Sequence, residues 1–340
     1  MSPPHPVDQL RPDGRLRHLL TLKGMPARTL MQLMDAAEAY GDAVAGGLAL
    51  RPRLAGRTVC TLFFEPSTRT RSSFQLAATR LGADTLNFDV SASSTSKGET
   101  ALDTMRNLEA MGVDCFVVRH AENDAVARLA AGARPGTAFV NAGDGRAAHP
   151  TQGLLDMLTV RRHKGADFSK LRFAIVGDIR HSRVARTDIH ALRTLGAGEI
   201  RVCAPATLLP DAHELHGCTV APSLDAALEG VDVVMMLRLQ RERMQEGLVP
   251  SLEGYYAEYG LDQARLGRAA ADAIVLHPGP MNRGVEIADE VADGPQSVIL
   301  EQVGNGVAVR MAVLYLLLGG NEPAVGTTET QPETTTGASA

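Results

Sequence analysis

One stretch in the first quarter of the chain changes from strand to helix periodicity within a few residues. Residues 58–64, Thr-Val-Cys-Thr-Leu-Phe-Phe, form a nearly continuous apolar and β-branched run, the pattern of a strand covered on both faces in a parallel sheet. Apolar residues then recur at helical spacing from Phe74 to Leu81, and Gly82 can end that helix. A buried strand followed directly by an amphipathic helix predicts a parallel α/β sheet.

The turn between this strand and this helix has the features of an anion site. Ser67 follows Pro66 and is a suitable N-cap. The helix start leaves the backbone N–H groups of Thr68, Arg69 and Thr70 without intrahelical partners, at the positive end of the helix dipole. The guanidinium of Arg69 adds a planar fork that matches a pair of phosphate oxygens. The alternative is an ordinary surface turn whose arginines are solvated.

Strand-like and helix-like segments alternate along the rest of the chain, and 340 residues suit two domains of ordinary size. We therefore predict an α/β protein with two doubly wound parallel-sheet domains linked by helices. The other expected strands are residues 85–90, 113–118, 137–141, 171–178, 199–204, 231–237 and 273–276. The other expected helices are residues 16–40 (divided at Pro26), 101–111, 122–131, 150–164, 182–195, 223–229 and much of 251–272.

We divide the chain into four segments. Residues 1–150 and 151–304 are expected to form the two domains. Residues 305–320 contain a helix that is hydrophobic nearly all round, so we expect it to be buried against the first domain. Residues 321–340 are rich in Thr, Glu, Gly and Pro, a composition that predicts a disordered tail.

Composition argues against several functional classes. The net charge of -5, the absence of Trp and an aromatic content of 4% disfavour nucleic-acid binding. No apolar run approaches the length of a membrane span, and residues 1–6 lack a signal-peptide pattern, so we expect a cytoplasmic protein without membrane association. The four cysteines form no CxxC or Cys/His cluster and are expected to be buried thiols rather than metal ligands; they are Cys60, Cys115, Cys203 and Cys218.

Polar residues follow several predicted strands, where ligands bind in open parallel sheets. Arg119 ends one strand, Arg183 begins the helix after another, and Arg238 and Gln240 follow a third. Arg183 and Arg238, at two strand ends, could hold two carboxylates through bidentate forks. The alternative is that both form surface salt bridges. No GxGxxG or P-loop pattern follows the strand at 171–178, so nucleotide binding has little support.

A histidine stands at another predicted helix start. His149 precedes Pro150 after a Gly-rich turn, with Gln152 in the first helical turn. The helix dipole should lower the pKa of the His149 imidazole. A neutral imidazole there could donate one hydrogen bond to a carbonyl oxygen without acting as a base. A lone histidine is, however, more often structural.

Over about residues 15–318, the ordered motifs of the chain resemble those of the aspartate and ornithine carbamoyltransferase family. These motifs are Ser-Thr-Arg-Thr-Arg (67–71), Arg-His (119–120), His-Pro-Thr-Gln (149–152), Arg-x-Gln (238–240) and His-Pro-Gly-Pro (277–280). The resemblance implies transfer of a carbamoyl group from carbamoyl phosphate to an amine, with no cofactor or metal. It also implies a set of carbamoyl-phosphate ligands: Ser67, Thr68, Arg69, Thr70, Arg119, His149, Gln152, Gly279 and Pro280, of which Arg69, Thr70, Arg119 and His149 are expected to act in catalysis.

A Ser-rich segment at residues 91–100 ends in Lys-Gly-Glu-Thr. Its composition alone indicates a flexible connector with a solvated Lys97. In the family, the corresponding loop covers the active site of an adjacent subunit. The resemblance therefore implies that Ser93 contacts the phosphate and that Lys97 contacts both substrates in catalysis, across the interface of a homotrimer. Regulatory chains or dihydroorotase are further partners that members of this family can have.

The amine acceptor is expected to be L-aspartate. Arg-x-Gln at 238–240 resembles the aspartate-binding signature, and the ornithine enzymes carry a Cys near the 277–280 turn that this chain lacks. Aspartate would then be held by Arg183, Arg238, Gln240 and Lys97. The reaction would give N-carbamoyl-L-aspartate, and it would be the committed step of pyrimidine biosynthesis. Transfer to another amine such as ornithine, and a non-catalytic anion-binding paralogue, are the alternatives.

Overall fold

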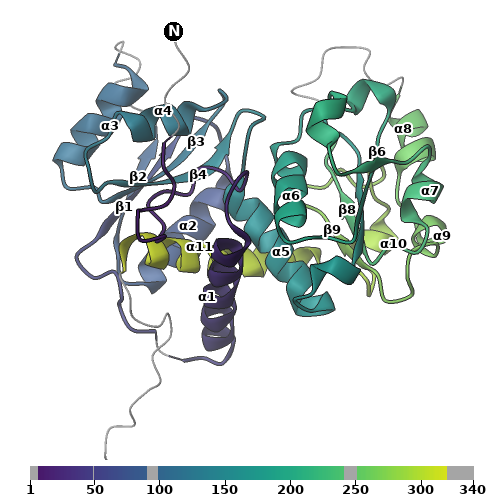
Figure 1. Ribbon diagram of the computed structural model, residues 1–340, viewed down its shortest axis with the longest axis horizontal. Helices are drawn as coiled ribbons and strands as arrows, with labels where there is room; N and C mark the ends of the chain where they lie inside the picture. The colour runs from purple at the N-terminus through teal and green to yellow at the C-terminus, as the bar shows by residue number, and fades with distance from the viewer. Residues whose placement is uncertain (1–6, 49, 90–98, 241–250, 320–340) are drawn as a thin grey trace, which may run out of the picture.

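Two parallel β-sheets organise the part of the chain that the structure describes, residues 7–48, 50–89, 99–240 and 251–319. In this computed structural model the sheets have the strand orders β2-β1-β3-β4 and β7-β6-β5-β8-β9, with every strand pairing parallel (Figure 1). The strands are β1 (Thr58–Phe63), β2 (Asp84–Asp89), β3 (Cys115–His120), β4 (Ala138–Asp144), β5 (Arg172–Val176), β6 (Glu199–Cys203), β7 (Thr219–Val220), β8 (Val233–Met236) and β9 (Ile274–Leu276).

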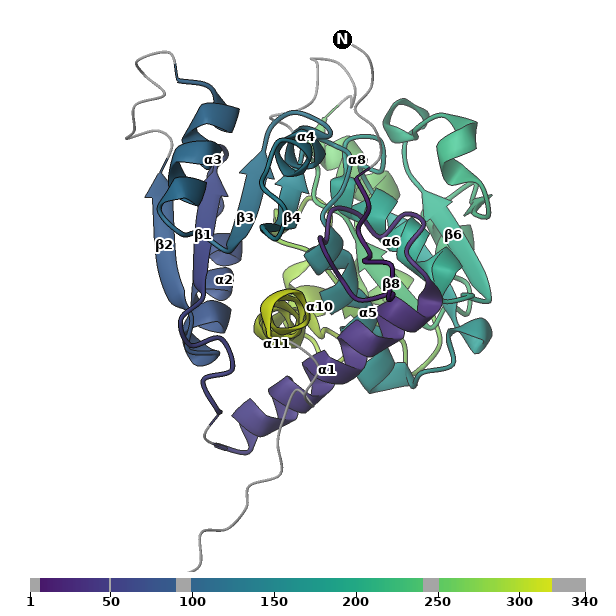
Figure 2. The same ribbon diagram turned by 60° about the vertical axis from the view of Figure 1, so that its left-hand side comes forward.

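Helices connect the strands and cover both faces of the sheets; some lie between the two sheets and others lie on the outer faces (Figures 1 and 2). They are α1 (Ala27–Ala45), α2 (Thr68–Arg80), α3 (Ala101–Ala110), α4 (Ala125–Ala131), α5 (Pro150–Lys164), α6 (Arg183–Thr194), α7 (Leu224–Leu228), α8 (Leu252–Tyr259), α9 (Gln263–Leu266), α10 (Asp289–Ala292) and α11 (Ile299–Leu318). This architecture confirms the predicted fold class.

The first sheet is buried on both faces, which explains the apolar runs of its strands. Along β3, Phe116 and Val118 belong to a core with side chains of α3 and α4. Cys115 and Val117 point to the opposite face, into a core with side chains of α1, α2 and α11. Because alternate residues both need an apolar environment, the sequence shows no polar alternation.

The C-terminal helix returns to the first half of the chain, as expected. Helix α11 packs against α1, α2 and α5, and Figure 2 shows it nearly end-on beside α2 and α1. Tyr315 meets Tyr40 of α1 edge-on, with ring centroids 6.0 Å apart. Burial of each large apolar side chain on this helix contributes about 1.5–3 kcal/mol. The helix begins at Ile299 rather than Asn305.

Two helix predictions were wrong in part. Residues 16–25 are not helical, although Leu16, Leu19 and Leu22 are buried. The Leu19 N–H instead donates to the carbonyl of Phe139 at 2.8 Å, so the backbone of this segment pairs with the edge strand β4 while its leucines enter the core. The segment at 251–272 contains two short helices, α8 and α9, separated at Gly260, and it buries Tyr255.

The cysteines behave as small apolar side chains. Cys60, Cys115 and Cys203 are buried, Cys218 is half-buried, and none is in a disulfide. Burial raises the pKa of the Cys60 thiol to about 12 and that of Cys203 to about 11, so both stay protonated at neutral pH. The described residues contain no cluster of His, Cys, Asp or Glu that could hold a metal ion.

Candidate active site

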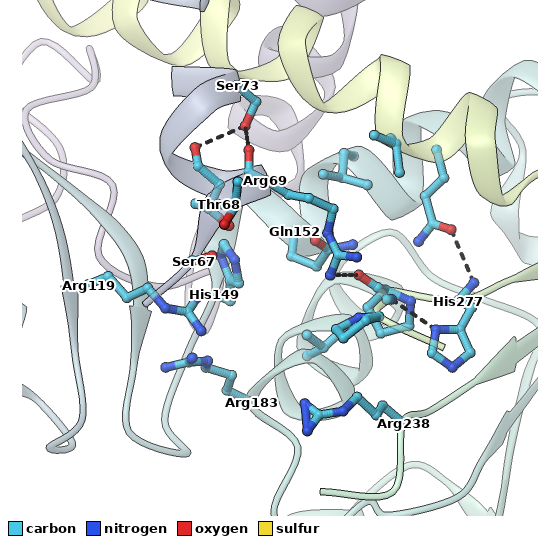
Figure 3. A pocket seen from close by; sticks show the side chains of 18 of the residues that line it. Ser67, Thr68, Arg69, Ser73, Arg119, His149, Gln152, Arg183, Arg238 and His277 are labelled. Carbon is cyan, nitrogen blue, oxygen red and sulfur yellow. Dashed lines mark hydrogen bonds between the residues drawn. The ribbon is translucent and has the colours of Figure 1, made fainter. Parts of the chain in front are cut away.

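A cleft of about 580 Å³ lies between the two halves of the protein, at the carboxyl ends of both sheets. Figure 3 shows side chains from both halves facing this space. Its lining includes every described residue that the sequence predicted for ligand binding: Ser67, Thr68, Arg69, Thr70, Arg119, His149, Gln152, Arg183, Arg238, Gln240, Gly279 and Pro280. The other two predicted residues, Ser93 and Lys97, lie outside the described residues, as does the predicted tail.

The cleft carries a strong excess of positive charge. Among the described residues five arginines line it, and Glu65 is the one carboxylate in the lining. The arginines are Arg69, Arg119, Arg183, Arg238 and Arg310. Cations held together in a concave site of reduced dielectric repel one another and attract anions. The cleft therefore suits ligands that bring several negative charges.

The N-terminus of α2 forms one wall of the cleft. Ser67 is the N-cap, in an extended conformation, and its hydroxyl makes no capping hydrogen bond to the helix. The Ser73 hydroxyl donates to the carbonyls of Arg69 (2.6 Å) and Thr70 (3.0 Å) within the first turns. The helix thus presents free N–H groups, two hydroxyls and a guanidinium on one side, the donors that a phosphate needs.

Arg69 also reaches the opposite wall. Its Nη2 donates to the carbonyl oxygen of Pro278 at 3.4 Å, and burial, with a smaller contribution from Arg238, lowers the pKa of its guanidinium. Gly279 has φ +63, and a Cβ atom there would lie 2.6 Å from Arg69 Nη1. Glycine at this position therefore allows the 277–280 turn to approach Arg69. The Gly279-Pro280 peptide bond is cis.

Glu65 is a site residue whose role was not predicted from the sequence. Its Oε2 atom lies 3.0 Å from Arg183 Nη2 and 3.4 Å from Arg119 Nε. Arg183 also donates to the Gly145 carbonyl at 3.3 Å and is almost fully buried. Glu65 thus joins an arginine from each half of the chain across the cleft. Its position two residues after the end of β1 is the signal that could have identified it from the sequence.

His149 is the N-cap of α5, and a backbone hydrogen bond links it to α6. Its N–H donates to the Thr187 hydroxyl at 3.0 Å, and no described group bonds to its buried Nδ1 atom. Burial first, and then the nearby Arg119, Arg183 and Arg310, hold the pKa of the imidazole well below its usual value. The predicted direction is confirmed, although burial is a larger cause than the helix terminus considered from sequence.

Further polar residues of the cleft come from the C-terminal helix and were missed. Arg310 of α11 lies over the Phe74 ring, 5.1 Å from its centroid, and burial lowers its pKa to about 10. Gln302 of α11 accepts from the His277 N–H at 3.1 Å, and both residues line the cleft. The strongly apolar character of α11 concealed these two polar positions.

The end of β8 contributes the remaining polar wall. Arg238 points toward the shared space in Figure 3, and the Gln240 N–H donates to Asp178 Oδ2 at 3.3 Å. Asp178 in turn lies 2.8 Å from His181 Nδ1. These contacts fix the backbone from which Arg238 and Gln240 extend. The site is therefore built from strand ends and helix starts of both halves.

Family models match nearly the whole folded part of the chain. The carbamoyl-phosphate-binding domain of aspartate/ornithine carbamoyltransferases matches residues 17–162, and the aspartate/ornithine-binding domain matches residues 169–317. The chain therefore belongs to the aspartate/ornithine carbamoyltransferase family, and it is a carbamoyl-group transferase. No helix of the described residues has the length and apolarity needed to cross a membrane.

Individual relatives carry the name of one branch of this family. The chain is 71% identical to the aspartate carbamoyltransferase catalytic subunit of Xanthomonas campestris pv. campestris, over 92% of this chain and 99% of that protein. It is 70% identical to the corresponding subunit of Stenotrophomonas maltophilia, again over 92% and 99%.

Solved structures of both branches share the fold. Aspartate transcarbamoylase from Trypanosoma cruzi in complex with N-(phosphonacetyl)-L-aspartic acid has 32% identity and a TM-score of 0.80, covering 92% of this chain and 98% of that chain. Ornithine carbamoyltransferase from Pyrococcus furiosus has 27% identity and the same TM-score of 0.80, covering 90% and 98%. Backbone similarity thus does not separate the two activities.

Proposed function

We propose that this protein transfers the carbamoyl group of carbamoyl phosphate to the amine of L-aspartate, giving N-carbamoyl-L-aspartate and phosphate. The observation that carries the proposal is the cleft with five arginines and one carboxylate, beside the N-terminus of α2. A phosphate and two carboxylates supply the negative charge that such a cleft attracts. The high identity to aspartate carbamoyltransferase catalytic subunits supports aspartate as the acceptor and pyrimidine biosynthesis as the pathway.

The residues divide by the chemistry that each can perform. Ser67, Thr68, Arg69 and Thr70 neutralise the phosphate. Thr70, Arg119 and a neutral His149 donate to the carbonyl oxygen as it becomes an oxyanion. Gln152 contacts the carbamoyl nitrogen, and Gly279 and Pro280 supply backbone contacts. This division requires no covalent nucleophile, because the amine attacks the carbonyl carbon directly as phosphate leaves.

The aspartate half of the site lies in the second domain. Arg238 and Gln240 hold the carboxylates and aim the amine at the carbonyl carbon. Arg183, from the start of α6 in the same half of the chain, joins them, although Glu65 already shares its charge. We propose that the departing phosphate accepts the proton that the amine releases. Residues 1–150 and 151–304, followed by the returning segment 305–320, are the domains that we assign to these two halves.

The acceptor is tested by assaying carbamoyl phosphate with L-aspartate and with L-ornithine side by side. We expect turnover with aspartate and none above background with ornithine, because cationic forks attract a side-chain carboxylate and repel a side-chain ammonium. Turnover with ornithine alone would overturn the aspartate assignment. Turnover with neither amine would favour the non-catalytic paralogue.

We further propose a cytoplasmic homotrimer whose sites are shared, with Ser93 and Lys97 reaching the cleft of a neighbouring subunit. Closed rings are a usual product of head-to-tail association. The unpaired cysteines are typical of a reducing compartment. Regulatory chains or dihydroorotase are additional partners that the family resemblance suggests.

Hybrid assemblies test the sharing of sites. An Arg69→Ala chain and a Lys97→Ala chain, each impaired alone, are unfolded, mixed in equal amounts and refolded. In randomly assembled trimers about one quarter of all sites should be intact. Such a site needs a Lys97→Ala chain, which supplies Arg69, beside an Arg69→Ala neighbour, which supplies Lys97. Mixing Arg69→Ala with the Arg69→Ala/Lys97→Ala double variant is the control. Equal activity of both mixtures would mean that each chain works alone.

A further inference from the structure

Two carboxyl groups that face each other are buried behind the cleft. Asp156 of α5 and Asp188 of α6 are both 0% exposed. The two helices approach closely because Gly153 lies between them: a Cβ atom there would be 2.7 Å from Thr187 Cγ2 and 3.2 Å from Asp188 Oδ1. A pair of ionised carboxylates in such a place would be strongly destabilising.

The hydrogen bonds around this pair are incomplete unless it holds a proton. Asp156 Oδ1 accepts from Gln152 Nε2 at 2.9 Å and from Gln302 Nε2 at 2.5 Å. No donor from the described residues reaches Asp156 Oδ2 or either oxygen of Asp188. Asp156 already accepts two N–H groups, so we place the proton on Asp188. Asp188 then donates this proton to Asp156, and the two carboxyl groups form a hydrogen bond instead of repelling each other.

The pair also controls the direction of an amide that faces the substrate. Asp156 Oδ1 accepts the N–H of Gln152 Nε2 at 2.9 Å, which leaves the Gln152 Oε1 atom on the other side of the amide as an acceptor, and Gln152 lines the cleft. The direction of the Gln302 amide is fixed as well. Its Oε1 accepts from the His277 N–H of the opposite wall, so its NH₂ group is the part that faces Asp156. An acceptor in the cleft recognises an NH₂ group and gains nothing from a methyl group.

We propose that Asp188 is a protonated positioning residue which, through Asp156, orients the Gln152 amide so that the cleft selects a carbamoyl group over an acetyl group. The choice of ligand rests on the proposed function, whereas the shared proton rests on the buried pair alone. The proposal makes Asp156 and Asp188 specificity determinants that do not touch the substrate.

The charges around the pair favour retention of the proton. Burial raises the pKa of Asp156 to about 7, and burial together with Asp156 raises the pKa of Asp188 well above its usual value. From α11, Arg310 acts on Asp156 in the opposite direction, and from α5 and α11 the two glutamines do the same. Arg310 also lines the cleft, and the charge of this one cation does not balance two buried carboxylates.

The first test measures stability against pH and needs no substrate. A raised pKa in the folded state stabilises the fold fully below the unfolded value of about 3.9, and this stabilisation is lost as the pH rises through the folded value. Asp188→Asn donates the same hydrogen bond without titrating. We therefore expect its Tm to exceed that of the wild type at about pH 8, with the difference shrinking toward about pH 4.

Glu258→Gln, at an exposed position of α8, is the matched control and should show no such pH-dependent difference. An Asp188→Asn variant less stable than the wild type at about pH 8 would overturn the shared proton. Failure of the carbamoyl-transfer assay would leave this result standing, so the two proposals fail separately.

The second test compares carbamoyl phosphate with acetyl phosphate as donors. Asp156→Leu removes the acceptor that turns Gln152, so the ratio of kcat/KM for the two donors should fall by roughly tenfold, the value of one hydrogen bond. Asp188→Asn should keep the wild-type ratio. An unchanged ratio in a folded Asp156→Leu protein would show that the pair has only a structural role, since a purely structural loss lowers both rates together.

Discussion

Replacing Arg69 with alanine should lower kcat/KM for carbamoyl phosphate by about a thousandfold. The guanidinium can make two charge-assisted hydrogen bonds to phosphate oxygens, each worth roughly 1.5–3 kcal/mol. Arg69 also bridges to the Pro278 carbonyl across the cleft, so its loss removes both a ligand and a contact between the walls. Steady-state kinetics with carbamoyl phosphate as the varied substrate measure the effect.

Arg71 offers a matched control on the same helix. Its guanidinium stacks over the Phe63 ring, 5.3 Å from the centroid, and it does not line the cleft. Arg71→Ala removes the same charge two residues away, so it should retain most of the activity. If both substitutions lowered kcat/KM equally, the general charge of the helix start, rather than the position of Arg69, would explain binding.

The parts of the site that could be predicted from sequence were those that lie where a strand ends or a helix begins. Arg69, Arg119, His149, Arg183 and Arg238 occupy such positions, and parallel topology brings these ends to the same edge of each sheet. Their types and order were sufficient to predict one anion site. One cleft contains all of them, and its binding of anions stays a prediction.

Residues inside helices could not be predicted in the same way. Arg310 and Gln302 lie within or near the apolar sequence of α11, and Gln302 meets Asp156 across 146 positions of the chain. Asp188 similarly reads as a polar residue on an amphipathic helix. Only the packing of α5, α6 and α11 brings Gln302 and Arg310 to the cleft and the two aspartates together behind it, because contacts between distant helices leave no periodic signal.

The misassigned segment at residues 16–25 has a comparable cause. Its leucines fit a helical period, and burial alone does not distinguish a helix from an extended segment that covers a sheet edge. Backbone pairing with β4 determined the outcome: the Leu19 N–H donates to Phe139, and the Asn141 N–H donates to the Leu19 carbonyl at 2.8 Å. Tertiary pairing of this kind overrides local propensity.

Substituting His149 with alanine should lower kcat by roughly 100-fold with a smaller change in the binding of carbamoyl phosphate, which is the usual effect of removing one oriented oxyanion donor. Because burial and the nearby arginines hold the pKa of the imidazole well below its usual value, we expect His149 to react as a neutral donor at about pH 7. The ratio of wild-type to His149→Ala rates should therefore stay constant from about pH 6 to about pH 9.

His149→Gln is the matched variant, because its amide retains a donor near the same place and should recover part of the lost rate. Arg119 remains to share the oxyanion in both variants, so activity is lowered rather than abolished. A complete loss of turnover with normal substrate binding, or a ratio that falls steeply as the pH drops from about 7 to about 6, would instead identify a His149 that must exchange a proton during the reaction.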